Sequence, residues 1–358
     1  MTVVQPITID ELASSIPARP AWIVRGGGTK PALARRSDDH AVLDLSRLAG
    51  IVEHTAEECT FTALAGTRIA DIERALAVHG QYLPFDPPLA ARGATIGGTV
   101  AAGVNGSCRY RFGGIRDFLI GARIVDSDGR VIHSGGKVVK NAAGFLLHQA
   151  MVGSCGRLGV VAELTFKVFP APQAHATVQV DAGDLGSAVA LLADVQAARF
   201  DLEAIDLIPP GGLVIRIGGA VSALDTRAAA LKATAGPDAR ILLDDDDAAV
   251  WRDARELTWV GGDAALVRVP LTLTQLPELD ARLSGHSCAR RYAVAGNLAW
   301  IAWPHPVALL DGMLREQSLV GQMLTGQSAA PFIGALMPNP FEQRLRSVMD
   351  PHARFSES

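Results

Sequence analysis

The sequence lacks the features that mark several common protein classes. No stretch of its 358 residues approaches the roughly 18 consecutive apolar residues of a membrane-spanning helix. The N-terminus has neither the basic start nor the apolar core of a signal peptide. Basic residues form no long run and the formal net charge is −4, so the composition does not indicate a nucleic-acid-binding protein. We therefore expect a cytoplasmic protein, with any membrane association made through partner subunits.

Cysteine is scarce and widely spaced. The chain contains no C-x-x-C pair, which disfavours a zinc ribbon or a cysteine-ligated iron–sulfur cluster. Four free thiols fit a reducing compartment. A run of four aspartates, Asp244 to Asp247, is typical of a solvated helix N-terminus, so the sequence predicts no metal site. The cysteines are Cys59, Cys108, Cys155 and Cys288.

The apolar content is high enough for a large core. Hydrophobic residues make up 49% of the chain and charged residues 20%, and the length favours two domains. Glycine-rich loops dominate before Pro170, whereas alternating strands and alanine-rich helices follow it. We expect an α+β fold with a first domain over residues 1–172 and a second α+β domain over 173–335. A C-terminal helix and tail over 336–358 should return to the first domain. No internal repeat is recognisable.

The stretch AWIVRGGGTKPAL, Ala21 to Leu33, places three consecutive glycines directly after an apolar run. Glycines in a row carry an entropic cost and leave the backbone uncovered by side chains. A dinucleotide fingerprint would need G-x-G-x-x-G opening a helix, which Pro31 interrupts. A Walker A loop would need a first glycine and a final hydroxyl residue that SGGKVV lacks. This motif by itself does not identify a nucleotide site.

Further glycine-rich segments follow in the same domain. They include GATIGGTVAAGVNGS, RYRFGGIRD, KVVKNAAGF and VGSCGRLGVV. Turns of this kind present backbone N–H groups that suit a diphosphate, and small residues between them leave room for a flat ring. The alternative is tight helix–sheet packing, which also uses glycine. Because several such loops recur, we expect a large ligand with phosphates and a planar ring system.

In order and spacing these segments resemble the FAD-binding subunits of bacterial glycolate oxidase, which are FAD-linked oxidases of the PCMH (vanillyl-alcohol-oxidase) type. The resemblance covers about residues 20–172. It rests on VRGGGTK, LAGTRIADIERALAVHGQYLPFDPP, ATIGGTVAAGVNGSCRYRFGGIRDF and MVGSCGRLGVVAELTFKVFP. It implies a PCMH-type FAD-binding domain of two α+β lobes with the cofactor between them, followed by an α+β cap domain.

The resemblance also implies which residues hold FAD. The RGGGT turn is expected to wrap the diphosphate, with Arg25 or Lys30 nearby. The second glycine-rich loop should follow the ribityl chain and isoalloxazine ring, and Pro87 should line the flavin face. The GSCGRLGVV turn should hold the adenine or the flavin edge. The residues so assigned are Arg25, Gly26, Gly27, Gly28, Thr29, Pro87, Thr95, Gly97, Gly98, Gly103, Gly106, Gly113, Gly156, Gly159 and Val160.

The chain departs from the family pattern at three places. Thr29 stands where some members carry a histidine that bonds FAD covalently, so the resemblance implies non-covalent FAD. Phe145 and Leu146 replace a tyrosine and an aspartate that are common in the family. The F-N-P-G-R segment that often ends the family's chains is absent, which puts any contact of that segment with FAD in doubt.

The sequence does not identify the catalytic residues. Oxidising a 2-hydroxy acid with a flavin needs a cation for the carboxylate, a base for the hydroxyl proton and flavin N5 as hydride acceptor. Four histidines follow residue 172, and none forms the close pair that binds a metal in related dehydrogenases. His286 and His305 are weighed as catalytic against surface or packing roles, and Arg290 and Arg291 are expected at the surface. These histidines are His175, His286, His305 and His352.

The resemblance implies an FAD-binding subunit that oxidises glycolate to glyoxylate within a complex. Because the chain has no cluster ligands of its own, electrons leaving its flavin need an external acceptor. Complexes of this family supply a paralogous flavoprotein subunit and an iron–sulfur subunit. Two alternatives stay open. One is a self-sufficient FAD-dependent dehydrogenase for D-lactate or another 2-hydroxy acid, and the other is a structural subunit that kept the fold and lost the flavin.

Overall fold

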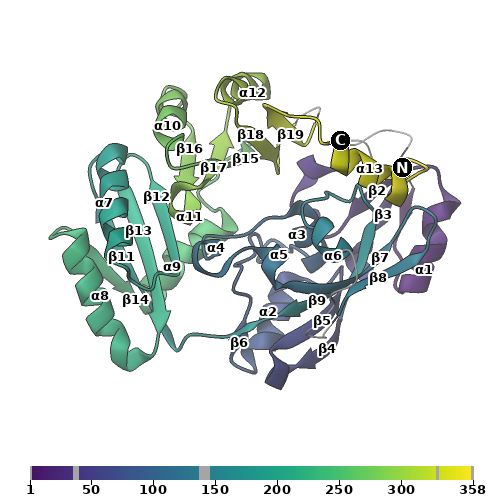
Figure 1. Cartoon of the computed structure of the whole chain (residues 1–358), viewed down its shortest axis with the longest axis horizontal. Helices are drawn as coiled ribbons and strands as arrows, with labels where there is room; N and C mark the ends of the chain where they lie inside the picture. Colours follow the sequence, from purple (N-terminus) through teal and green to yellow (C-terminus); the bar gives the residue numbers. More distant parts are fainter. Residues whose placement is uncertain (1, 35–39, 137–145, 328–329, 356–358) are drawn as a thin grey trace.

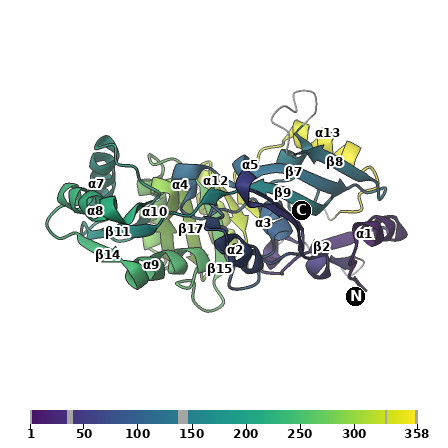
Figure 2. The ribbon, with the colours of Figure 1, turned by 90° about the horizontal axis from the view of Figure 1, so that it is seen from below.

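The computed structural model describes residues 2–34, 40–136, 146–327 and 330–355. Figure 1 shows an elongated molecule with the N-terminal region at one end, beside the C-terminal helix. The sheet and helices that follow residue 173 form the other end. Figure 2 gives the same arrangement from below, with α7 and α8 far from the N-terminus.

The first lobe is a small parallel sheet. Within the described residues its strands run in the order β1 (Val3–Val4), β3 (Ala41–Asp44), β2 (Trp22–Arg25). Helix α1 (Ile9–Ser15) packs on it, and Thr8 caps this helix by accepting a hydrogen bond from the Glu11 amide, as the sequence predicts. Because β2 ends at Arg25, the glycine triplet begins where the chain leaves the sheet.

The second lobe is an antiparallel sheet. In the described parts of the chain its order is β4 (Ile51–Thr55), β5 (Thr60–Leu64), β9 (Val160–Lys167), β7 (Leu119–Val125), β8 (Val131–Gly135). Strands β7 and β8 form the hairpin predicted around Ser127-Asp128-Gly129. Helices α2 (Ile69–Ala77) and α3 (Ile96–Ala102) share a core with this sheet. The short elements are β6 (Gln81–Tyr82), α4 (Arg109–Phe112), α5 (Ile115–Phe118), α6 (Leu147–Ala150) and β10 (Phe169–Pro170).

The second domain is one large antiparallel sheet. Over the described ranges its strand order is β14-β11-β13-β12-β16-β17-β15-β18-β19. The strands are β11 (Ala174–Asp181), β12 (Ala204–Ile208), β13 (Gly212–Gly219), β14 (Arg240–Leu243), β15 (Ala265–Pro270), β16 (Ala289–Tyr292), β17 (Leu298–Trp303), β18 (Val320–Met323) and β19 (Phe332–Gly334). The helices are α7 (Leu185–Ala197), α8 (Val221–Ala235), α9 (Asp244–Glu256), α10 (Leu276–Ser284), α11 (Ala293–Gly296) and α12 (Val307–Glu316).

The element order of this domain reveals a duplication. The series β11-α7-β12-β13-α8-β14 and β15-α10-β16-β17-α12-β18 follow the same βαββαβ plan, each with its first and third strands in the centre. The two units join between β12 and β16, where Leu207 pairs with Tyr292. No repeat is recognisable in the sequence, because the two units share an order of elements and not a set of residues.

The large sheet has two different faces. Val267 and Val269 of β15 pack in one core with α7, α8, α10 and α12. Leu266 of the same strand and Trp300 of β17 belong instead to the core of the second lobe. Successive residues of a strand point to opposite faces, so one face carries these four helices and the other lies against the N-terminal domain (Figure 1).

The C-terminal segment contacts the first two lobes. Helix α13 (Pro340–Met349) places Met349 in the core of the second lobe, and the Ser127 amide donates to its carbonyl. Beyond the helix, the Trp22 amide donates to the Arg354 carbonyl, and Phe355 is buried in the core of the first lobe. Residues at the two ends of the chain therefore pack together.

The structure also bears on membrane-spanning helices, metal sites and disulfide bonds. The described residues contain no helix that is both long and apolar enough to span a bilayer, and no group of three or more potential metal ligands. All four cysteines are free thiols.

Candidate functional site

A cavity of about 210 Å³ opens beside the glycine triplet. The loop from Arg25 to Pro31 forms one part of its wall. Residues of the α3 segment, among them Thr95, Gly98 and Ala102, form another part, and Cys155 contributes from the VGSCGRLGVV turn. Three of the glycine-rich segments quoted from the sequence therefore contribute to a single cavity.

A second cavity of about 500 Å³ touches the same loop. It shares Arg25, the three glycines and Thr95 with the first cavity. Asp44, Ser46, Arg68, Arg92 and Gly93 are among its other lining residues. The backbone of the glycine triplet is thus accessible from two hollows, which suits a ligand that runs past it.

The first two glycines of the triplet are required by packing. A Cβ on Gly26 would lie 2.3 Å from Thr95 Oγ1, and a Cβ on Gly27 would lie 1.9 Å from the Gly93 carbonyl oxygen. Gly28 has φ +67° and no such overlap, so it is glycine for its left-handed conformation. The tight packing weighed as an alternative therefore holds for Gly26 and Gly27. This packing also shapes the cavity, because it brings the glycine triplet close to the backbone of the second glycine-rich loop.

Thr95 determines where the second glycine-rich loop becomes helical. It is the N-cap of α3, and its Oγ1 accepts a hydrogen bond from the Gly98 amide at 3.3 Å. Gly103 ends the helix with φ +64°. The same threonine thus starts the helix and meets Gly26 across the loop contact.

Lys30 places an uncompensated cation at the first cavity. Its ammonium nitrogen donates to Thr29 Oγ1 at 3.1 Å, and no carboxylate pairs with it among the residues that the structure describes. Burial lowers the pKa of Lys30 to about 8. A phosphate beside Lys30 would restore the charged form, because a nearby anion favours it.

Arg25 is paired, in contrast. Its Nη2 donates to Asp44 Oδ2 at 2.6 Å. Burial opposes ionisation of Asp44, but hydrogen bonds from Arg25 and Ser46 outweigh that effect and lower the pKa of this carboxyl. Arg25 therefore supports the start of the loop, and Lys30 is the free positive charge beside it.

The other residues assigned to FAD line neither cavity. They are Pro87, Gly97, Gly103, Gly106, Gly113, Gly156, Gly159 and Val160. For most of them the structure offers a packing or conformational reason. Gly97 lies against Ala65 and Gly106 against Asp86, both too close for a Cβ. Positive φ angles occur at Gly103, Gly113, Gly156 and Gly159, and Val160 is buried in the core. Their contact with FAD stays a prediction.

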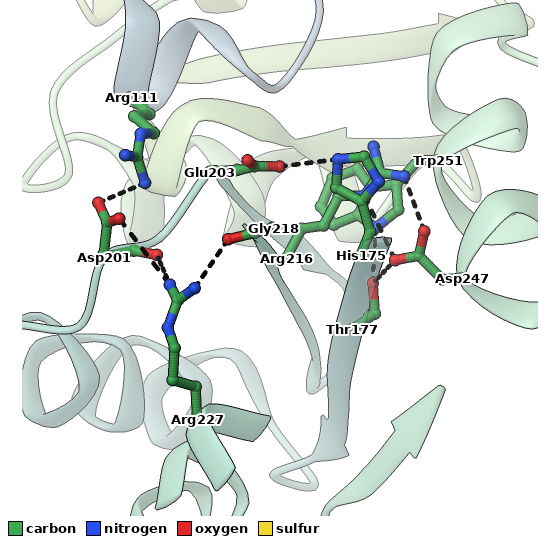
Figure 3. A network of polar contacts seen from close by, with 10 residues as sticks. All are labelled: Arg111, His175, Thr177, Asp201, Glu203, Arg216, Gly218, Arg227, Asp247 and Trp251. Atoms are coloured by element: carbon green, nitrogen blue, oxygen red, sulfur yellow. Dashed lines mark hydrogen bonds and ion pairs between the residues drawn. The ribbon is translucent and has the colours of Figure 1, made fainter. Parts of the chain in front are cut away.

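The histidines considered for catalysis line neither of these cavities. His175 lies 3.2 Å from Glu203 (Figure 3), and His352 lies 2.9 Å from Asp128. His286 and His305 pack against each other, and His305 Nε2 lies 2.8 Å from the His286 carbonyl oxygen. His286 and His305 thus lie together, whereas His175 and His352 each make a separate local contact.

Arg291 corrects the expectation of a surface charge. It is buried, and its Nε donates to Asp206 Oδ2 at 2.6 Å. Arg290, which is half-buried, pairs with Asp280. Neighbouring residues of β16 point to opposite faces of the sheet, so the two arginines find different partners. Of the two residues that replace the family's tyrosine and aspartate, Phe145 lies outside the described residues and Leu146 is half exposed.

Figure 3 shows a second network of paired charges on the large sheet. Arg216 donates to Asp247 at 2.7 Å, and Thr177 Oγ1 donates to the same carboxylate. The Trp251 ring nitrogen in turn donates to Thr177 Oγ1 at 2.7 Å. Arg111 of α4 pairs with Asp201, which joins this part of the sheet to the N-terminal domain.

Comparisons with known proteins agree with this geometry. Residues 2–135 match a family described as FAD binding domain. The structure superposes on alkyldihydroxyacetonephosphate synthase with a TM-score of 0.71 and 15% sequence identity, covering 98% of this chain and 74% of that one. The fold of this chain resembles that of the PCMH-type FAD-linked oxidases. The expected α+β fold and FAD as cofactor are thereby confirmed.

Curated relatives match part of this chain in sequence. Glycolate oxidase subunit GlcE of Escherichia coli (strain K12) is 39% identical over 166 residues, which are 46% of this chain and 47% of that protein. Glycolate oxidase subunit GlcD of Bacillus subtilis (strain 168) is 32% identical over 173 residues, 48% of this chain and 36% of that one. A D-lactate dehydrogenase of Archaeoglobus fulgidus is 32% identical over 148 residues, 41% and 33% of the two chains. The matched segments span less than half of each relative.

The residues of the cavity fit the FAD diphosphate. Bare backbone at Gly26 to Gly28 gives anions close access, and Lys30 supplies a charge that no described carboxylate neutralises. Sequence reasoning missed two buried polar residues behind the cavity wall, Arg268 and Gln322. Their positions in the sequence carry no motif, so only the folded sheet brings them to this place.

Proposed function

We propose that this chain is the FAD-binding subunit of a complex that oxidises glycolate to glyoxylate. The observation that carries the proposal is the first cavity, where two glycine-rich loops meet beside Lys30. The similarity of about half of this chain to two glycolate oxidase subunits supports the choice of substrate. The domain limits expected from the sequence, 1–172, 173–335 and 336–358, are part of this proposal.

When bound, FAD supplies a ring that takes a hydride from the α-carbon of the 2-hydroxy acid and passes the electrons on. The chain itself would hold the cofactor. Gly26, Gly27 and Gly28 offer backbone amides, and Thr29 and Lys30 offer a hydroxyl and a cation to the diphosphate. Thr95, Gly98 and the remaining glycines assigned from the resemblance would follow the rest of the cofactor.

FAD is proposed to bind without a covalent bond. Thr29 stands at the position where a histidine would make that bond, and a threonine hydroxyl at neutral pH is a weak nucleophile. Precipitating the FAD-loaded protein with acid should release all yellow colour into the supernatant. Colour that stays on the precipitated polypeptide would contradict this part of the proposal.

The electron acceptor is proposed to be an iron–sulfur subunit, with a paralogous flavoprotein subunit in the same complex. The printed names of the two glycolate oxidase relatives are those of subunits, which supports a multi-subunit assembly. Pulling the tagged chain from its native host and assaying flavin and iron in the eluate tests this. An eluate with flavin and no iron would contradict the proposal of an iron–sulfur partner. The proposal that the chain associates with a membrane through its partners would then lose its support.

A second candidate is a self-sufficient dehydrogenase for D-lactate or another 2-hydroxy acid. The 32% sequence identity between part of this chain and a D-lactate dehydrogenase favours this candidate. The two candidates separate in a dye-reduction assay of the purified chain with glycolate and with D-lactate. Full activity without partners favours the second candidate. A chain that shows no absorbance near ~450 nm after incubation with FAD and removal of the unbound FAD would be a structural subunit.

A further inference from the structure

Four polar or aromatic side chains form a row across the large sheet, on the face that lies against the FAD-binding domain. Arg291 of β16 is opposite Trp300 of β17, Trp300 is opposite Arg268 of β15, and Arg268 is opposite Gln322 of β18. Trp300 belongs to the core shared with the FAD-binding domain, and paired residues of adjacent strands share a face. All four side chains therefore point from the sheet toward that domain.

The two arginines of this row differ in their partners. Arg291 and Asp206 form an ion pair with side chains that are 5% and 0% exposed. Arg268 is 8% exposed, and its polar contact is a hydrogen bond from Nη1 to Gln322 Oε1 at 3.1 Å. Among the described residues no carboxylate pairs with Arg268, and its Nε has no hydrogen-bond partner. Burial, together with the positive charge of Arg109, lowers the pKa of Arg268 to about 10.

Gln322 connects this guanidinium to the cofactor cavity. Its Nε2 donates to the Ala102 carbonyl oxygen at 2.9 Å, and its side chain lies close enough to Cys155 to affect the pKa of that thiol. Ala102 and Cys155 both line the cavity beside the glycine triplet. The Arg268 side chain is therefore one residue behind the wall of the cofactor cavity, held there by an amide whose two ends are both used.

A buried charge without a counter-ion is costly, so a protein keeps one where a ligand supplies the opposite charge. A guanidinium has parallel N–H groups that match a carboxylate in a bidentate pair. The positive charge of Arg109, on α4, adds to the cost of keeping Arg268 charged, and no described carboxylate offsets that cost. A small carboxylate is the ligand that both the charge and the fork geometry favour.

We propose that Arg268 binds the carboxylate of the 2-hydroxy acid, and that Gln322 is the residue that positions Arg268 toward the cofactor cavity. The inference rests on the proposed function and names the part of the chain that recognises the substrate. It also accounts for the lack of a charge partner at Arg268, since the substrate and its product both carry a carboxylate.

The test uses the full chain loaded with FAD, with oxalate and glycolate as probes and the flavin absorbance as the signal. Wild type should bind oxalate saturably. Arg268→Gln should bind FAD to the same content and weaken oxalate binding by about 100-fold or more, and Arg268→Lys should recover part of that loss because it keeps a charge. Arg282→Gln, an exposed arginine on α10, is the control and should match wild type.

Gln322 is tested by two substitutions that differ in charge. Gln322→Glu would place a carboxylate against Arg268 and should abolish oxalate binding at neutral pH with FAD content unchanged. Gln322→Leu removes the hydrogen bonds without supplying an anion, so it should weaken oxalate binding by roughly tenfold. A merely structural role would make the two variants alike, and that result would overturn the assignment of Gln322.

The outcomes separate the inference from the proposed function. If wild type takes up no FAD, the proposed function fails. If FAD binds and Arg268→Gln binds oxalate as wild type does, the inference fails while FAD binding stands. If Arg268→Gln loses FAD, the anion beside Arg268 belongs to the cofactor, and the assignment to substrate is wrong.

Discussion

Two sets of basic side chains in this protein differ in how their charge is compensated. On the large sheet, Arg216 pairs with Asp247 and Arg291 pairs with Asp206, and all four groups are largely buried. Near the cofactor cavity, Lys30 and Arg268 have no carboxylate partner within the described chain. Both sets lie in the interior, so burial alone does not distinguish them. The paired set joins elements of the second domain, and the unpaired set indicates where an anionic ligand belongs.

The largest expected effect compares one arginine of each set on stability. Arg291→Met leaves the Asp206 carboxylate buried without its ion pair and should lower the free energy of unfolding by about 3–5 kcal/mol. Arg268→Met removes an uncompensated charge and should leave that free energy within about 1 kcal/mol of wild type, or raise it. Urea unfolding without added FAD measures both. Equal losses in the two variants would mean that the distinction between the sets is wrong.

A smaller effect is expected at the loop contact that shapes the cavity. Gly27→Ala puts a Cβ against the Gly93 carbonyl oxygen, which cannot rotate away, so the two loops must separate. The strain of about 1–3 kcal/mol should appear as a roughly 10- to 100-fold weaker affinity for FAD. Gly312→Ala on α12 is the matched control, because no atom lies within 4 Å of its added Cβ. Titration of FAD, followed by flavin fluorescence, should show wild-type affinity for this control.

The pH dependence of FAD binding sharpens the role of Lys30. Its pKa is lowered to about 8 in the unliganded site, and the FAD diphosphate would raise it. Affinity should therefore be constant below pH 8 and should fall as the pH rises above 8, by at most about tenfold per pH unit. Lys30→Met should bind FAD roughly tenfold more weakly at pH 7 and show a flatter profile between pH 8 and 10. A wild-type affinity that stays unchanged to pH 10 would exclude Lys30 from the diphosphate.

The smallest effect is expected at Arg25, which is paired but 44% exposed. Arg25→Gln should lower the free energy of unfolding at pH 7 by less than about 1 kcal/mol, because water screens the pair. Because the pKa of Asp44 is lowered in the folded state, its carboxylate stabilises the fold when the pH is above the ordinary pKa of an aspartate. This contribution is lost as the pH falls through the acid range. Arg25→Gln should reduce that acid sensitivity slightly in thermal unfolding between pH 3 and 7. If Arg25→Gln lowered the free energy of unfolding as much as Arg291→Met does, the Arg25–Asp44 pair would be energetically equivalent to the buried ion pairs.

Local signals in the sequence predicted several elements and part of the site. The β7–β8 hairpin follows from alternating apolar residues around Ser127-Asp128-Gly129, and α2 follows from the spacing of Ile69, Ile72 and Leu76. Gly26 to Gly28, Thr29 and Thr95 were assigned from a motif and its resemblance, and the fold brings them to one cavity. These features depend on neighbours a few residues away, which a sequence displays directly.

Local sequence signals do not predict contacts between residues that are far apart in the chain. The Gln322 side chain meets the Ala102 carbonyl 220 positions away, and Arg291 meets Asp206 across 85 positions. No spacing rule relates such pairs, so the sequence predicts Arg291 at the surface and carries no signal that identifies Arg268.

By itself the sequence determined the turns, the helix periods and the bare glycine backbone, because these depend on the conformational preferences of adjacent residues. The tertiary structure decided which charges are paired and which are left for a ligand. It also decided that two βαββαβ units form one sheet. Both outcomes depend on which residues, distant in the sequence, are buried against one another. Tertiary packing decides this.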